Sequence, residues 1–378
     1  MQEAIKNLQN SALFNLSLTS KELFHSNFLF WLANKYKLEI GTIFANKFNL
    51  NVKNKILSET PKREQENIDL LLEYDNAVII IENKVKSIPN LKQLNEYKEK
   101  MDRKFDKEKL FLLLSLSEPL FFTGKVEFRN WKFLSYREYA ELLKKVQISN
   151  TYDKMILEDY INFIENLVKI DEMIILSDSL MSKNDDEFLK KLIEIRFYDF
   201  YYKKKYSLLM YELYKKLSFI DSKKILISEK PEKNKYLSNH IYLNFDFSNK
   251  AKQGLIEFKI VVDDDFAIGT QVEGFCYKQY VHSNGVQDWN KAIEYSNSLD
   301  NNNLEKKWFK FNSFPNNIII KPELGSQKGN RTLANYYSYK PDFIYKAVEL
   351  KKDIKTNELI DLLVSDIKEA IKIFRITI

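Results

Sequence analysis

Cysteine and histidine are nearly absent from this sequence of 378 residues. The single cysteine, Cys276, cannot form a disulfide within the chain. Together with only three histidines, it also cannot assemble a tetrahedral zinc site of the usual kinds. The histidines are scattered along the chain, at His25, His240 and His282. A redox role and a structural zinc role are therefore excluded.

Glycine and proline are also sparse, at eight and seven residues, far below the roughly 12% of an average chain. This scarcity favours long regular elements, mostly helices, with few tight loops. No apolar run approaches the length of about 20 residues that spans a membrane, and residues 1–18 lack the apolar segment of a secretory signal. We therefore expect a cytoplasmic protein with no membrane partner.

Charged and aromatic residues are abundant by contrast. The apolar fraction of 44%, with 27 Phe and 22 Tyr, is ample for packed cores and excludes a disordered chain. The 59 basic residues exceed the 53 acidic ones by a formal charge of +6. A net charge this small does not by itself name a polyanionic partner. The length predicts two domains or one elaborated core, and we place the boundary near residue 150.

Residues 1–150 predict an α/β core in the order α-β-β-β-α-β. The expected elements, in chain order, are a helix from about residue 20 behind a capping box at 19–22, a β-prone piece at 55–59, strands at 67–74 and 77–83, a helix at 91–101, strands at 109–116 and 131–134, and a helix at 136–146. The two residues between the central strands, Asp75 and Asn76, predict a tight hairpin.

Residues 151–378 predict a helical segment followed by an antiparallel-β α+β region. Residues 152–217 are mostly helical in pattern, with 185–217 as one long amphipathic candidate. Apolar residues alternate with polar ones between 237 and 272, which is typical of an antiparallel meander. Further helices are expected at 286–299 and 356–374. This region is a candidate for substrate binding or self-association.

The hairpin brings three charged residues onto one face of its sheet. With Asp75 and Asn76 as the turn, Asp69 faces Glu82 directly, and like charges in opposed positions repel. Lys84 shares that face, because side chains alternate along a strand. Two carboxylates at the end of an otherwise apolar hairpin therefore require a cation.

An oxygen-rich site with two carboxylates and room for water suits Mg²⁺, or Mn²⁺, which prefers octahedral oxygen coordination. Such an ion activates water and offsets the charge that develops on a phosphate, while an adjacent ammonium holds the water or stabilises the transition state. The pattern therefore indicates metal-dependent hydrolysis of phosphodiesters.

These residues resemble the PD-(D/E)XK nuclease superfamily. Residues 67–70, Asn-Ile-Asp-Leu, occupy the place of its PD element, with isoleucine in place of proline. Residues 81–84, Ile-Glu-Asn-Lys, match its E-x-K element, and the order of elements matches its restriction-endonuclease-like core. The sequence looks most like prokaryotic proteins with an IENK strand followed by a Gln-x-x-x-Tyr helix, here residues 93–97, a pair that also resembles the RecB-type branch.

The resemblance implies a role for each matching residue. Asp69 and Glu82 would ligate the metal, and the Asn83 carbonyl would add a ligand. Lys84 would assist the attacking water. Glu22 matches an acidic residue of the first helix that often completes such a site, although its third place in a capping box accounts for it equally well.

Other residues have weaker claims to the site. Gln93 and Tyr97 lie at i and i+4 on one helical face, so they either belong to the site, Gln93 among the catalytic residues, or serve as helix surface and packing. His25, one turn beyond Glu22, is a structural or substrate-contacting residue. The acidic run at 263–265 is interpreted as a turn.

Two basic stretches are candidates for substrate contact. Lys203 and Lys204 lie in a run of lysines and tyrosines, a mixture that nucleic-acid contacts often use but that more often forms a solvated helix face. Arg331 lies in a stretch with two glycines, which is a weak signal for a phosphate-contacting loop. Nucleotide-binding glycine loops are absent from the sequence.

We therefore expect a Mg²⁺-dependent nuclease acting on DNA, in a restriction, repair or antiviral defence context that could include a homo-oligomer or a partner protein. An RNA endonuclease is the second enzyme hypothesis, because the same chemistry serves either polymer. A non-catalytic nucleic-acid-binding or interaction subunit is the alternative from another class. The competing interpretation of Glu82 and Lys84 is a surface ion pair, contributing about 0 to 1 kcal/mol.

Overall fold

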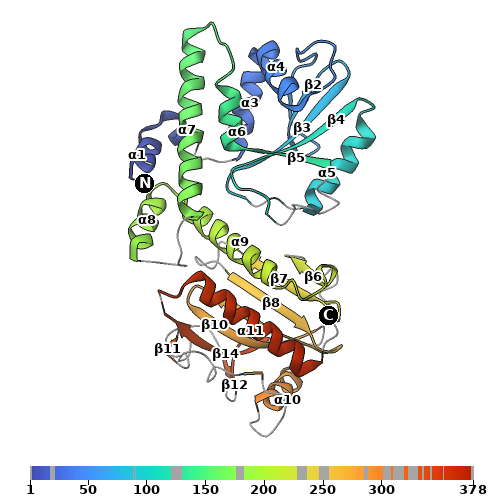
Figure 1. The fold of residues 1–378 in the computed structure, drawn as a ribbon, viewed down its shortest axis with the longest axis vertical. Coiled ribbons are helices and arrows are strands. Elements are labelled where there is room, and N and C mark those ends of the chain that lie inside the picture. The colour runs from blue at the N-terminus through green and yellow to red at the C-terminus, as the bar shows by residue number, and fades with distance from the viewer. Residues whose placement is uncertain are drawn as a thin grey trace. The chain divides into compact units, whose positions relative to one another are not determined.

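The computed structural model divides the chain into two units (Figure 1). The first unit comprises residues 1–176 and 188–204, and the second comprises 177–187 and 205–378. The first unit thus continues beyond residue 150, where the sequence analysis ends the core. The structure describes residues 2–17, 22–87, 89, 91–120, 130–175, 183–227, 236–246, 255–284, 288–300, 308–309, 319–321, 331–333, 336–340, 343–351 and 353–375.

The first unit is built on a mixed sheet of five strands in the order β1-β2-β3-β4-β5. The strands are β1 (Lys62–Gln65), β2 (Ile68–Glu73), β3 (Ala77–Lys84), β4 (Glu108–Ser115) and β5 (Trp131–Ser135). The first three strands pair antiparallel, whereas β3, β4 and β5 run parallel. Strands β2, β3, β4 and β5 begin and end within one or two residues of the positions expected from the sequence.

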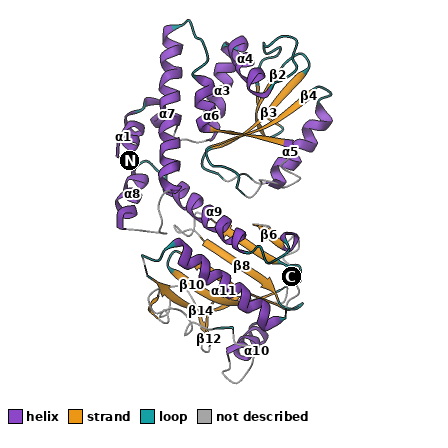
Figure 2. Cartoon of the chain, viewed as in Figure 1, coloured by secondary structure: helices purple, strands orange, loops and turns teal. Residues whose placement is uncertain are grey.

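Helices flank this sheet on both faces (Figure 2). The helices of this unit are α1 (Gln2–Asn10), α2 (Ala12–Leu16), α3 (Glu22–Lys35), α4 (Lys37–Phe48), α5 (Leu91–Lys104), α6 (Tyr136–Leu143) and α7 (Thr151–Ile175). Helix α5 packs on the sheet, α3 and α6 also contact its strands, and α1 and α2 contact α7. The order α-β-β-β-α-β is confirmed from α3 to β4, with three unexpected helices, α1 and α2 before it and α4 within it. The strand expected at 55–59 is wrong, because that segment forms bends and the edge strand is β1. The capping residues 19–21 lie outside the described part of the chain.

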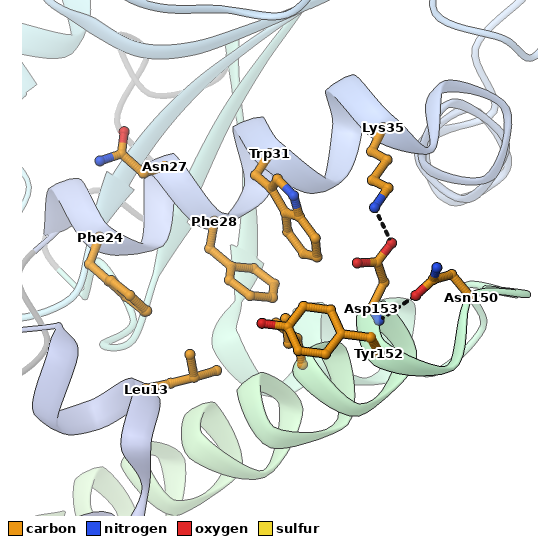
Figure 3. A pocket seen from close by; sticks show the side chains of 10 residues that line it. Leu13, Phe24, Asn27, Phe28, Trp31, Lys35, Asn150, Tyr152 and Asp153 are labelled. Carbon is orange, nitrogen blue, oxygen red and sulfur yellow. Dashed lines mark hydrogen bonds and ion pairs between the residues drawn. The ribbon is translucent and has the colours of Figure 1, made fainter.

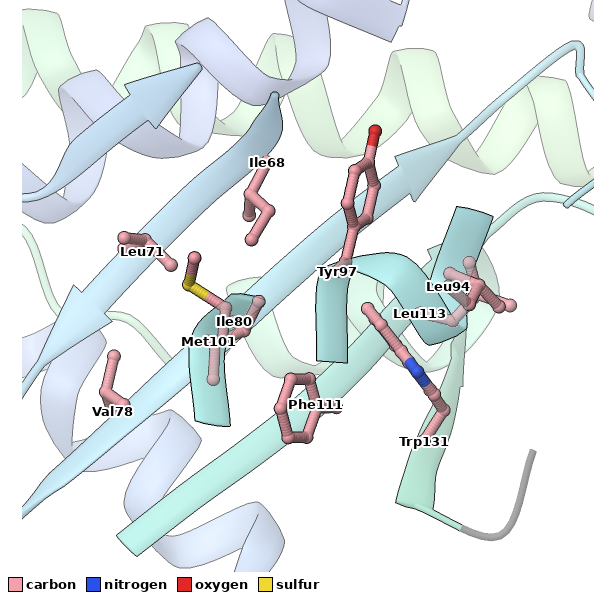
Figure 4. Packing of buried hydrophobic residues seen from close by; sticks show 10 residues of the cluster. All are labelled: Ile68, Leu71, Val78, Ile80, Leu94, Tyr97, Met101, Phe111, Leu113 and Trp131. Carbon is pink, nitrogen blue, oxygen red and sulfur yellow. The ribbon is translucent and has the colours of Figure 1, made fainter. Parts of the chain in front are cut away.

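Alternation along the strands determines which side chains each face buries. Leu71 of β2 and Ile80 of β3 are direct partners in the ladder and lie on the face covered by α5. Leu94 and Met101 of α5 pack onto them, together with Phe111 of β4 (Figure 4). Leu70 and Ile81 point to the opposite face, which packs against α3. The hairpin is therefore buried on both faces, as its continuous apolar run requires.

The second unit contains a nine-stranded sheet in the order β12-β13-β14-β10-β9-β8-β7-β6, with β11 also paired to β14. Its strands are β6 (Ile225–Ile227), β7 (Ile241–Asp246), β8 (Leu255–Val261), β9 (Phe266–Glu273), β10 (Cys276–Ser283), β11 (Ile319–Lys321), β12 (Arg331–Leu333), β13 (Tyr336–Lys340) and β14 (Phe343–Leu350). The antiparallel meander from β7 to β10 is confirmed. Asp263 accepts hydrogen bonds from two backbone amides in the turn before β9, so the acidic run is a turn.

The remaining helices follow the expected pattern with one difference. They are α8 (Lys183–Glu194), α9 (Tyr198–Lys216), α10 (Trp289–Asp300) and α11 (Thr356–Phe374), with a short 3₁₀ turn at Ser222–Lys224. The single helix expected over 185–217 is wrong, because the chain turns at 195–197 and divides it into α8 and α9. Within the described residues, no helix is long and apolar enough to cross a membrane.

Helix α11 is attached to the second sheet by a buried polar cluster. Asp366 accepts hydrogen bonds from the Thr270 hydroxyl at 2.7 Å, the Tyr277 hydroxyl at 2.8 Å and the Gln279 amide at 3.0 Å. Three donors satisfy a carboxylate that would otherwise be costly to bury. The cluster is therefore a structural link between α11 and strands β9 and β10.

Candidate active site

The register of the β2–β3 hairpin determines where its charged residues lie. Leu70 pairs with Ile81 and Glu73 with Val78, and the Tyr74 amide donates to the Ala77 carbonyl at 2.8 Å across the turn. This is the register predicted for a two-residue turn. Continued by one residue, it sets Asp69 opposite Glu82.

Alternation then separates the functional side chains from their neighbours. Asp69, Glu82 and Lys84 lie on the sheet face that α5 covers, whereas Asn83 points to the opposite face. There the Asn83 amide donates to the Ser26 hydroxyl at 3.2 Å and accepts from the Tyr136 hydroxyl at 2.7 Å. The Asn83 side chain thus holds β3 in place, and only its backbone can serve the site.

Direct contacts hold the three charged side chains. The Asn83 backbone N–H donates to Asp69 Oδ2 at 2.7 Å, and Lys84 Nζ lies 2.7 Å from Glu82 Oε1. The other oxygen, Glu82 Oε2, is buried and has no hydrogen-bond partner among the described residues. Asp69 and Lys84 remain partly exposed, so the cluster opens to solvent on one side. A buried carboxylate oxygen without a donor is rare in native proteins, and a cation bound to that oxygen would compensate its charge.

Burial and mutual repulsion disfavour the charged forms of both carboxylates. Burial, followed by the nearby Asp69 charge, raises the pKa of Glu82 to about 7. Burial also raises the pKa of Asp69, although the Asn83 N–H and the Lys84 ammonium oppose this shift. Burial acts to lower the pKa of Lys84, but the Glu82 carboxylate outweighs it and the net shift is upward. The site thus holds two carboxyl groups and one ammonium that stays charged.

Glu22 lies at the edge of this cluster, at the start of α3. Its Oε1 accepts hydrogen bonds from the Val85 amide at 3.2 Å, the Ser87 amide at 3.0 Å and the Ser87 hydroxyl. Its charge also contributes to raising the pKa values of Asp69 and Glu82. Glu22 therefore anchors the chain that follows β3 and adds negative charge beside the carboxylate pair.

The residues present fit a hard divalent cation that keeps part of its hydration shell. Within the described chain, no group of three or more His, Cys, Asp or Glu side chains is placed to hold a metal ion. Asp69 and Glu82 would therefore supply two carboxylate ligands, and the Asn83 carbonyl, water and substrate oxygens the remainder. Mg²⁺ is commonly bound by one or two carboxylates in this way. The unpartnered Glu82 Oε2 is the observation that fits such an ion.

Gln93 and Tyr97 of α5 lie over the same face of the sheet. The Gln93 amide donates to the Tyr97 hydroxyl at 2.6 Å. Burial raises the pKa of Tyr97, and the Glu82 charge adds to that rise. Figure 4 shows the Tyr97 hydroxyl directed away from Phe111, while its ring packs in the core cluster. Tyr97 thus serves packing with its ring and can offer its hydroxyl to the site.

His25 lies in the core, which supports the structural one of its two expected roles. Its side chain is buried, its Nδ1 lies 2.9 Å from the Tyr160 hydroxyl, and the rings of Phe24, Tyr136 and Phe163 surround it. Burial lowers the pKa of His25 to about 3. The residue is a neutral core histidine between α3 and α7.

The two lysines of the basic run have different environments. Lys204 is 6% exposed and pairs with the buried Asp171 at 3.1 Å, so its expected role in substrate binding is wrong. Lys203 is partly exposed and pairs with Asp199 at 3.3 Å, one helical turn away. Arg331 begins β12, and its side chain is outside the described part of the structure. Helical periodicity turns neighbouring residues to different sides, which a run of letters does not show.

A pocket of about 590 Å³ lies elsewhere in the first unit, between α2, α3 and α7. Figure 3 shows apolar and aromatic side chains along it, among them Phe24, Phe28 and Trp31, with the Lys35–Asp153 ion pair at one end. None of the charged hairpin residues lines this pocket. Its lining is mostly aromatic and aliphatic, and its one carboxylate, Asp153, is already paired with Lys35.

Two contributors to the site escaped the sequence analysis, Ser87 and Tyr136. Each binds a polar side chain from a segment about 50 to 65 residues away in sequence, and no local pattern marks such a pairing.

Comparisons with protein-family models, with curated proteins and with solved structures find no match. The assignment of a function therefore depends on the geometry of the site and on the resemblance of its motifs.

Proposed function

We propose that this protein is a metal-dependent nuclease that hydrolyses phosphodiester bonds in DNA, with a restriction-endonuclease-like core in its first unit. The observation that carries the proposal is that Glu82 Oε2 is buried without a donor among the described residues, next to Lys84. The β2–β3 register, continued by one residue, sets Asp69 opposite Glu82 on the same sheet face. The resemblance of these motifs to PD-(D/E)XK nucleases supports DNA as the substrate and a prokaryotic defence, restriction or repair context.

The residues of the site would divide the chemistry between them. A Mg²⁺ ion bound by the two carboxylates supplies activation of water and charge compensation at the phosphate. Asp69 and Glu82 fix its position, because both project from strands of one rigid hairpin. The Lys84 ammonium, held by Glu82 Oε1, is oriented to donate to the attacking water or to a phosphate oxygen. Tyr97 can add a hydroxyl donor from α5.

A cleavage assay with purified protein tests this proposal. Linear duplex, circular duplex, single-stranded DNA and RNA are each incubated with Mg²⁺, Mn²⁺ or EDTA. We expect cleavage of DNA with either metal and none with EDTA. Cleavage of RNA alone would assign the same site to the other polymer, and metal-independent binding without cleavage of any substrate would contradict the nuclease proposal.

Replacing the site lysine provides the matching mutational test. Lys84→Ala is expected to lower kcat by about 10²- to 10³-fold, because it removes the ammonium that contacts Glu82 beside the paired carboxylates. The control is Lys62→Ala, which removes an ammonium 2.6 Å from the buried Glu73 in the same sheet. Lys62→Ala should retain cleavage. Equal activity of the two variants would remove Lys84 from the mechanism.

A further inference from the structure

A group of basic side chains lies where the chain after β3 meets the turn between α8 and α9. Its members are Lys86, Arg196 and Lys203, all in the first unit, and we call it the basic cluster. Lys86 follows Lys84 by two residues, whereas Arg196 lies 110 residues further along the chain. The fold thus brings cations from a distant turn to the end of the strand that carries Glu82 and Lys84.

Lys86 links the chain after β3 to the turn between α8 and α9. Its Nζ donates to the Arg196 carbonyl at 2.8 Å and lies 4.2 Å from the centroid of the Phe197 ring. No ion pair to Lys86 occurs among the described residues. Burial lowers the pKa of Lys86 to about 8. The Asp199 charge opposes this shift, and the charges of Lys203 and Arg196 add to it. A partly desolvated ammonium among other cations is a group that an anion would stabilise.

Arg196 occupies a backbone position that usually belongs to glycine. Its φ is 53°, and it follows α8, where the Arg196 amide bonds to Ile193 O and the Phe197 amide to Leu192 O. This is the Schellman arrangement, whose left-handed residue is most often glycine. Its guanidinium is exposed and has no hydrogen bond or ion pair within the described chain. The Arg196 guanidinium is therefore an exposed cation at the end of α8 that can bind an anion.

The cluster lies beside the carboxylate site because Glu22 contacts the same segment. The residues on either side of Lys86, Val85 and Ser87, both donate their amides to Glu22 Oε1. The Glu22 charge contributes to the pKa values of both Glu82 and Lys86. Asp199 also acts on Lys86, and it already pairs with Lys203. The three cations of the basic cluster thus lie near two carboxylates, Glu22 and Asp199, that already have partners.

We propose that the basic cluster binds DNA backbone phosphates that neighbour the phosphate to be cut. Arg196 is its principal contact. This inference rests on the proposed nuclease function and names the surface that would hold its substrate. The guanidinium presents a rigid fork of donors that matches the oxygens of a phosphate. Lys86, whose Nζ donates to the Arg196 carbonyl, and Lys203, whose charge acts on Lys86, add two ammonium groups.

The test uses Arg196→Gly in the full-length protein. Glycine removes the guanidinium and suits the positive φ, so the variant should unfold at a temperature no lower than the wild type. The matched control is Arg375→Gly, since Arg375 is also exposed, has a φ of 50° and follows the last residue of α11 in the second unit. Both variants lose one positive charge and relieve the same backbone conformation. Arg196→Lys keeps the charge without the fork.

Binding of a fluorescent duplex DNA is measured in EDTA over a range of salt concentrations. Each phosphate contact contributes about 0.9 to the slope of log affinity against log salt. Arg196→Gly should reduce the slope by about that amount and weaken binding about fivefold at ~0.15 M salt. Arg375→Gly should change neither, and Arg196→Lys should recover most of the slope.

The outcomes separate this inference from the proposed function. If the wild type cleaves DNA and Arg196→Gly has the slope and affinity of Arg375→Gly, the nuclease proposal stands and the basic cluster is not its phosphate contact. If both glycine variants weaken binding equally, the effect is one of net charge and the inference is also overturned. If the wild type neither binds nor cleaves DNA, both proposals fail together.

Discussion

Glu82→Gln is expected to lower DNA cleavage by about 10²- to 10³-fold while making the metal-free protein more stable at pH 8. The loss of activity follows from removing one of the two carboxylates that we propose as metal ligands. The gain in stability follows from the environment of the native side chain, which is buried, faces Asp69 and leaves Oε2 without a donor among the described residues. A residue kept for folding would show the opposite effect on stability.

The pH dependence of the gain follows from the raised pKa of Glu82. Its ordinary value is 4.5, and burial with the Asp69 charge raises it to about 7 in the folded protein. Below pH 4.5 the group is protonated whether the chain is folded or not, so it contributes no difference. Between these values the unfolded chain releases the proton and the folded chain keeps it, so the free energy of unfolding falls as pH rises. Above pH 7 the loss is complete, at about 3 kcal/mol.

Denaturant unfolding of wild type and Glu82→Gln at pH 4 and pH 8, in EDTA, measures this contribution. The free energies of unfolding of the wild type and Glu82→Gln should nearly coincide at pH 4. At pH 8 they should differ by up to the full loss described above. Added Mg²⁺ should stabilise the wild type, by about 1.4 kcal/mol at a tenfold excess over its Kd, and stabilise Glu82→Gln much less. The glutamine retains the shape of the side chain, so packing is largely preserved.

Glu73→Gln is the control for burial of a carboxylate in the same hairpin. Glu73 is 6% exposed, but Lys62 and Lys107 lie 2.6 and 3.5 Å from its two oxygens. Because its charge is compensated, neutralising it should cost stability at pH 8 and leave cleavage intact. If Glu82→Gln also loses stability at pH 8, or cleaves DNA like the wild type, Glu82 is a structural residue and the metal site is refuted.

The hairpin could be predicted from sequence because its determinants are local. Two turn residues, Asp75 and Asn76, and a strict alternation are enough to set the register, and the register sets Asp69 opposite Glu82. Periodicity also placed α5, α6 and α11, but it did not mark α1, α2 and α4 or the break between α8 and α9. The edge strand was misplaced because β1, with its exposed and charged side chains, has no apolar pattern to mark it.

The environments of single side chains could not be predicted, because they depend on contacts between distant segments. His25 is neutral and buried because Tyr160, 135 residues away, packs against it. Glu22 was assigned equally to a cap and a ligand, whereas its carboxylate binds the backbone after β3. The turn at Arg196 was missed because arginine rarely ends a helix in the left-handed conformation. Local propensity does not carry this information.

Lys204→Met is expected to destabilise the protein by about 3 to 5 kcal/mol at pH 8, the largest stability effect among these variants. Lys204 Nζ lies 3.1 and 3.2 Å from the two carboxylate oxygens of Asp171, and both side chains are buried. The substitution leaves a buried charge whose remaining partner among the described residues is the Ser117 hydroxyl, at 3.1 Å. Burial already raises the pKa of Asp171, and the loss of the ammonium should raise it further.

The pH dependence and a neighbouring lysine make this prediction specific. Protonation of Asp171 relieves the unpaired charge, so the deficit of Lys204→Met should shrink as pH falls through the raised pKa. Asp171→Leu added to Lys204→Met should recover part of the stability, since no charge is then buried.

Lys203→Met, one residue away, is the control, because it removes only a partly exposed pair with Asp199. We expect it to change the free energy of unfolding by less than about 0.5 kcal/mol. It should lower the salt slope in DNA binding. Lys204→Met should thus change the free energy of unfolding, whereas Lys203→Met should change DNA binding. Equal effects of the two substitutions on the free energy of unfolding would contradict this prediction.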